Sequence, residues 1–152
     1  MTDHADLRDM LAAEEDALLV DGENYEFDVD FVELKESKAG RKFLKLTLVV
    51  AEGAKEGTEV EELLFWPTGP DDKGYSFFKR KLNAFNLSIP KLVEHGVYGV
   101  DQLDQLAEAL EGAPVAGKAN VKDAYNAPDE KENGVWLNRS ERLDVDKHVQ
   151  FG

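Results

Sequence analysis

The sequence predicts a mixed α+β protein that is mainly β, built as a five-stranded Greek-key barrel with a helical connection between the third and fourth strands. Three observations support this prediction. Apolar residues alternate with polar ones on both sides of a central block. That block has the 3.6-residue period of helices. The first strand also changes phase part-way along, as a β-bulge requires. A chain of 152 residues is long enough for one such domain.

Residues 3–19 have a helical pattern with a thin apolar stripe of Leu7, Leu11 and Leu18. Asp21-Gly22 ends the pattern. We therefore expect residues 1–21 to form an acidic N-terminal helix or arm, residues 22–143 to form the barrel domain, and residues 144–152 to form a short acidic tail.

The first three strands follow residue 21. From residue 25 the alternation predicts a strand whose inward side chains are Tyr25, Phe27, Val29 and Phe31, and after a bulge Val32 and Leu34. Ala39-Gly40 predicts a turn. Residues 42–50 predict a second strand with leucines inward and with Arg41, Phe43, Lys45 and Thr47 on the other face. Residues 58–66 predict a third strand, which Pro67 ends.

The rest of the barrel is predicted by the same two periods. Residues 75–87 and 100–112 are expected to be helices, whose apolar stripes are Phe78, Leu82 and Phe85, and Leu103, Leu106 and Leu110. Residues 114–125 predict a fourth strand, residues 126–134 a polar loop, and residues 135–143 a fifth strand. A bulged first strand and a helix between strands three and four are typical of an OB-type barrel. A small β-sandwich with packed helices is the alternative.

The charge of the chain is unevenly distributed. The formal net charge is −14, yet residues 34–48 carry +4 and residues 73–91 carry +5 with no acidic residue among them. These two basic segments are explained either by local balance against nearby acids or by contact with a polyanion.

Sequences that imitate catalytic motifs lack the groups that the chemistry needs. Residues 112–119 are one residue short of a P-loop and end in Ala119, where Mg²⁺ binding needs a hydroxyl. Asp21 with Glu33-Leu34-Lys35 resembles a metal-dependent nuclease set, but only one strand is predicted there. There are no cysteines, and the three histidines are scattered. We expect no enzymatic activity, no metal and no cofactor.

A binding function is better supported. Phe43 lies on the outward face of the second predicted strand between Arg41 and Lys45, and single strands bind where basic groups contact phosphates and aromatic rings stack on bases. Trp66 and Trp136 either join this face or pack in the core. The candidate contacts for single-stranded DNA are Lys35, Lys38, Arg41, Lys42, Phe43, Lys45, Trp66, Lys79, Arg80, Lys81, Lys118, Lys122, Trp136 and Arg139.

Residues 22–143 resemble the phage-encoded single-stranded-DNA-binding proteins of OB fold. The resemblance rests on Gly22 with Tyr25, the turn Lys35–Gly40, the strand "FLKLTLVV", Gly57 with Val60, and the segment Leu110–Lys118. It implies a replication or recombination accessory that binds single-stranded DNA without sequence preference in the host cytoplasm. It also implies protein partners of replication or recombination, recruited through the acidic ends.

The strongly negative net charge also indicates a different class of function. An acidic protein-interaction module or DNA mimic would occupy the basic groove of a host protein, and the acids at 1–24 and 101–111 would form its surface. No apolar run is long enough to span a membrane and residues 1–10 lack the apolar core of a secretory signal, so a cytoplasmic protein is expected.

Overall fold

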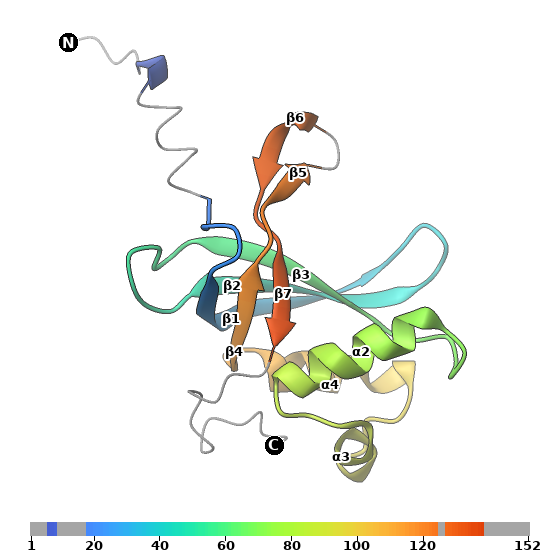
Figure 1. Cartoon of the computed structure of the whole chain (residues 1–152). Coiled ribbons are helices and arrows are strands. Elements are labelled where there is room, and N and C mark those ends of the chain that lie inside the picture. The colour runs from blue at the N-terminus through green and yellow to red at the C-terminus, as the bar shows by residue number, and fades with distance from the viewer. Residues whose placement is uncertain (1–5, 9–17, 125–126, 139–152) are drawn as a thin grey trace, which may run out of the picture.

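The computed structural model describes residues 6–8, 18–124 and 127–138, and its centre is a curled five-stranded antiparallel sheet (Figure 1). The strands lie in the order β3-β2-β1-β4-β7. In chain order the elements are β1 (Asn24–Glu36), β2 (Lys42–Val50), β3 (Glu59–Phe65), α2 (Lys73–Ala84), α3 (Ile89–Glu94), a 3₁₀ turn (Val100–Gln102), α4 (Leu103–Leu110), β4 (Pro114–Ala119), β5 (Lys122–Ala124), β6 (Ala127–Glu132) and β7 (Val135–Asn138). The mixed, mainly β class predicted from the sequence is confirmed.

The bulge in β1 is confirmed, but it lies earlier than predicted, and this changes the direction of one side chain. The register with β2 shifts between Val29 and Phe31, so an extra residue lies there. Val29 is buried, whereas Phe31 pairs with Thr47 on the outer face and is 41% exposed. The expectation that Phe31 points inward was wrong because the bulge precedes it instead of following it.

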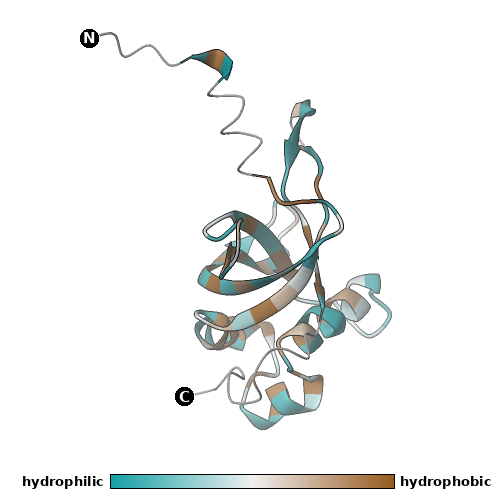
Figure 2. Ribbon diagram, turned by 60° about the vertical axis from the view of Figure 1, so that its left-hand side comes forward, coloured by the Kyte–Doolittle hydropathy of each residue, from teal (hydrophilic) through white to brown (hydrophobic). Residues whose placement is uncertain are grey.

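The core lies inside the curl of the sheet and under the helices. Leu44, Leu46, Leu48 and Val50 of β2 are all buried, as the alternation predicted. The predicted helix stripes are also buried: Phe78, Leu82 and Phe85, and Leu103, Leu106 and Leu110. Figure 2 shows the strands curling around this interior, with hydrophilic and hydrophobic segments alternating along their ribbons. Apolar burial of this kind is the main favourable term in folding.

Helix α2 lies against the two edges of the sheet. It packs against β3 and β7, which do not pair with each other in the part of the chain that the structure describes. Helix α4 packs against β1. The sheet is therefore an open half-barrel, and α2 is placed beside the gap between its edge strands.

Three elements differ from the sequence prediction. The segment expected to be one strand, 114–125, is divided into β4 and β5, and the expected loop 126–134 contains β6, which pairs with β5. The hairpin β5–β6 projects from the sheet (Figure 1). Helix α3 was not predicted, because six residues beginning Ile89-Pro90 are too few to display a helical period.

Gly117 belongs to the segment that resembles a P-loop, and in the structure it lies in β4. A Cβ at this position would collide with the side chain of Val135 and lie 3.1 Å from the carbonyl oxygen of Trp136. The glycine allows β4 and β7 to approach each other, which is a structural role.

Some predictions fall outside the described residues. These are most of the N-terminal helix 3–19, Arg139 and the remainder of the last strand, and the tail 144–152. Among the described helices, none combines the length and the apolar character that crossing a membrane requires.

Candidate nucleic-acid interface

The outer face of β1, β2 and β3 carries the aromatic residue predicted from the sequence. Phe43 stacks on Phe65, with 4.7 Å between the ring centroids, and Lys35 is opposite Phe43 on β1. The guanidinium of Arg41 lies 5.2 Å from the centroid of Phe65. Cross-strand neighbours share a face, so these side chains meet because of the register. Phe65 was missed by the sequence analysis because its partner in β2 depends on that register.

The predicted cations of this face are held by acids. Lys45 pairs with Glu61 at 3.0 Å, and this hydrogen bond and the charge of Glu61 raise the pKa of the Lys45 ammonium. Four further pairs are Lys35–Glu33 at 3.6 Å, Lys42–Glu36 at 3.3 Å, Arg41–Asp72 at 2.8 Å and Lys81–Glu62 at 2.9 Å. Local charge balance therefore accounts for most of the basic segment 34–48.

Asp72 connects this face to helix α2. Its carboxylate accepts hydrogen bonds from the backbone N–H groups of Thr68 and Gly74, from the Thr68 hydroxyl and from Arg41. The two backbone hydrogen bonds, with the charge of Arg41, hold the pKa of Asp72 below its usual value. Asp72 is the N-cap of α2, so the contact fixes where the helix begins.

A second surface joins α2 to the edge of the sheet. We call it the cation–aromatic patch, and it consists of Phe77, Arg80, Lys118 and Trp136. The guanidinium of Arg80 lies 5.0 Å from the centroid of Phe77 and 5.1 Å from that of Trp136. Both rings are half exposed, at 48% and 51%, and Lys118 is directly opposite Trp136 across β4 and β7.

Local periodicity explains how the sequence builds this patch. Phe77 and Arg80 are three residues apart on the exposed side of α2, so their side chains are neighbours. Trp136 points outward because Leu137, the next residue of β7, is buried. Neither Arg80 nor Lys118 has a carboxylate partner among the residues that the structure describes. These two cations are therefore available to an anionic ligand.

The remaining predicted contacts are dispersed. Trp66 points to the inner side, where its ring packs edge-on against Phe78 at 5.4 Å. The ammonium of Lys79 lies 4.5 Å from the centroid of Tyr75. Lys38 is exposed in the β1–β2 turn, and Lys122 is exposed at the base of the β5–β6 hairpin. The structure brings Arg80, Lys118 and Trp136 together, and it separates Trp66 from them.

Phe77 was missed by the sequence analysis. A signal was present, because Phe77 lies outside the helix stripe of Phe78, Leu82 and Phe85 and is three residues before an arginine. An exposed aromatic ring beside a cation on a helix is a binding feature that spacing alone can reveal.

The described residues contain no group of three or more histidines or carboxylates placed to hold a metal ion. No model of a known protein family matches the chain, and no curated protein matches it.

Proposed function

We propose that this protein binds single-stranded DNA without sequence preference, as an OB-type barrel that serves replication or recombination in the cytoplasm. The observation that carries the proposal is the contact of Arg80 with the exposed rings of Phe77 and Trp136, with Lys118 opposite Trp136. Exposed rings stack on bases and unpaired cations bind phosphates, and neither contact depends on base identity. The strand order and the helices between β3 and β4 support the OB-type assignment.

The cation–aromatic patch favours binding of single-stranded DNA over duplex DNA. Stacking on Trp136 and Phe77 requires the face of a base, and the faces are covered by neighbouring base pairs in a duplex. The experiment is a titration of labelled oligo-dT and of a duplex with the full-length protein at low salt. We expect oligo-dT to bind more tightly and the affinity to fall as salt rises, because each phosphate contact on a single strand gives a slope of about −0.7 in log K against log salt.

An acidic interaction module or DNA mimic predicts the opposite result. Four ion pairs favour this alternative, because they neutralise Lys35, Arg41, Lys42 and Lys45, which are most of the cations of segment 34–48. It predicts no binding of oligo-dT at low salt and instead a salt-sensitive complex with a basic protein. Absence of oligo-dT binding would therefore reject the proposal in favour of this second function.

A further inference from the structure

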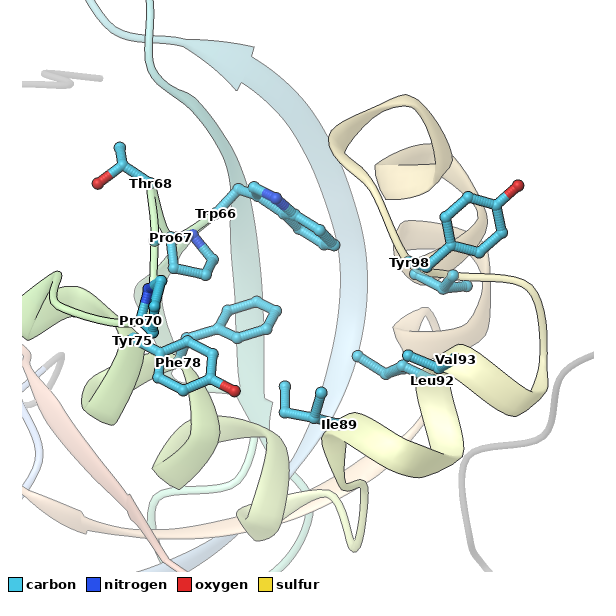
Figure 3. A pocket seen from close by; sticks show the side chains of 12 residues that line it. Trp66, Pro67, Thr68, Pro70, Tyr75, Phe78, Ile89, Leu92, Val93 and Tyr98 are labelled. Carbon is cyan, nitrogen blue, oxygen red and sulfur yellow. The ribbon is translucent and has the colours of Figure 1, made fainter.

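A cavity of about 290 Å³ lies on the other flank of α2 from the cation–aromatic patch. It is enclosed by the β3–α2 connection, by α2, by α3 and by the segment after α3 (Figure 3). None of the residues that line it is charged: Trp66, Pro67, Thr68, Gly69, Pro70, Tyr75, Phe78, Ile89, Leu92, Val93, Val97 and Tyr98. Small-molecule pockets begin at about 300 Å³, so this cavity accommodates one ring-sized group.

Aromatic side chains from separate elements form much of the cavity wall. Trp66 and Tyr98 lie on facing sides in Figure 3, with Tyr75 and Phe78 contributed by α2. The rim is apolar and open to solvent, because Tyr98 is 71% exposed and Val93 is 53% exposed. Exposed apolar side chains around a hollow are typical of a surface that receives a ligand. A flat ring is the shape that such aromatic walls accept by stacking.

Unpaired cations of α2 lie beside the cavity. The ammonium of Lys79 lies over the ring of Tyr75, which lines the cavity. Lys73 and Arg80 are also exposed on α2, and none of these three cations pairs with a carboxylate in the described part of the chain. A ligand that enters beside Lys79 is therefore favoured if it carries negative charge outside the ring.

The cavity and the patch lie on opposite flanks of one helix. Tyr75 and Phe77 are two residues apart, which is a rotation of about 200° around an α-helix. Lys73 and Arg80 lie on the exposed side between these flanks. A helix with its side chains is about 10–12 Å across, and a few nucleotides of an extended strand cover that distance.

From this arrangement we propose that the cavity holds one nucleobase of the bound single strand, while the phosphates cross the cationic side of α2 to the patch. The inference rests on the proposed function and adds a second base-binding position to it. Uncharged aromatic walls take the base, and Lys79 and Lys73 take the neighbouring phosphates. An apolar side chain of an acidic peptide is the competing occupant.

The test blocks the cavity without removing any core residue. Val93→Trp places a large ring at the rim, and Val100→Trp is the matched control, because Val100 is also an exposed valine but does not line the cavity. We expect Val93→Trp to weaken oligo-dT binding about fivefold or more relative to Val100→Trp, which is the lower end of base stacking. An oligomer with the same phosphates but abasic sugars should bind both variants equally.

A measurement on the unaltered protein covers the case in which a variant misfolds. The chain has two tryptophans, so its indole N–H groups give two NMR signals. Oligo-dT should shift both, Trp136 in the patch and Trp66 in the cavity. If only the Trp136 signal moves, or if Val93→Trp binds oligo-dT as Val100→Trp does, the cavity holds no base and single-strand binding at the patch stands. If the unaltered protein does not bind oligo-dT, both proposals fail together.

Discussion

Arg80 is suited to contact a phosphate while it remains stacked. Its guanidinium lies over both Phe77 and Trp136, and it is a planar group with five N–H donors that match the oxygens of a phosphate. A lysine has neither the plane nor the fork of donors. This geometry presents a charge and two aromatic faces at one point on the surface.

The first prediction concerns Trp136. Trp136→Ala should weaken oligo-dT binding by about 1–3 kcal/mol, because it removes a stacking face. The free energy of unfolding should change by no more than about 0.5 kcal/mol, since the ring is half exposed. Affinity and the urea midpoint measure the two effects separately. Phe31→Ala is the control, because Phe31 is also an exposed aromatic but is beside Thr47 and Glu61 instead of a free cation. Equal losses of affinity in both variants would contradict the assignment.

The second prediction concerns the ion pair of Lys45. Glu61→Gln frees the Lys45 ammonium on the face that carries Phe43, whereas Glu59→Gln removes the same charge from β3 without breaking a described ion pair. Both substitutions should raise affinity for oligo-dT at low salt. Only Glu61→Gln should also steepen the salt dependence by about 0.7 in slope, the value of one added phosphate contact. Identical slopes would show that DNA does not reach Lys45.

At the scale of elements, the start of α2 fixes the position of this helix and of the cations that it carries. Asp72 caps the helix and binds Arg41 in the same place. A Cβ on Gly74 would lie 2.8 Å from the Arg41 guanidinium, so a larger residue here would force the end of that side chain to shift. The N-cap of α2 is thus anchored through Arg41 to the start of β2 and to the residue after β3.

The third prediction follows from the lowered pKa of Asp72. Because the folded protein favours the carboxylate more than the unfolded chain does, Asp72 stabilises the fold fully above its unfolded pKa of about 3.9. That stabilisation is lost as the pH falls through the lower folded-state value. Asp72→Ala should therefore lower the urea midpoint at pH 7 and flatten the loss of stability below about pH 4. A control, Asp71→Ala, changes an exposed neighbour with no described hydrogen bond. If the urea midpoint of Asp72→Ala falls below pH 4 as steeply as that of the unaltered protein, Asp72 does not have this role.

Elements with a local period were predictable from the sequence, and contacts that depend on pairing were not. The alternation in β1 and β2, the phase change at the bulge and the stripe of α4 follow from side-chain direction within a single segment. Those residues of the β5–β6 hairpin whose burial the structure describes are exposed or half-exposed, so no buried apolar face marks β6. The ion pairs between β1, β2 and β3 depend on a register that the sequence does not encode in any one segment.

The candidate site was predictable in part for the same reason. The outward direction of Trp136 and Phe43 follows from strand alternation, and the exposure of Arg80 follows from the helical period. That Arg80 meets Trp136 depends on how α2 packs against β7, which is a tertiary contact. Trp66 lies one residue beyond β3, where the alternation turns it toward Phe78.

The whole molecule combines a cationic surface with a strongly negative total charge. The chain has 32 acidic and 18 basic side chains. In the described part of the chain, ion pairs occupy several cations of the sheet and Lys81 of α2, and they leave Lys73, Lys79 and Arg80 of α2 and Lys118 of β4 unpaired. Acids elsewhere on the molecule repel a polyanion at long range. Affinity for DNA should therefore depend on acids that never touch it.

The last prediction tests that long-range effect at the acidic N-terminal segment. Residues 1–21 contain seven carboxylates and one arginine, a net charge of −6, whereas residues 144–152 have a net charge of −1. Deleting residues 1–21 should tighten binding of oligo-dT at low salt, and deleting 144–152 should do so less. Salt should remove the gain, because the Debye length falls from about 30 Å at 0.01 M to about 8 Å at 0.15 M. If both truncated proteins are folded and bind at low salt as the full chain does, neither end repels DNA from the patch. If the gain survives at 0.15 M, the segment instead covers the patch by direct contact.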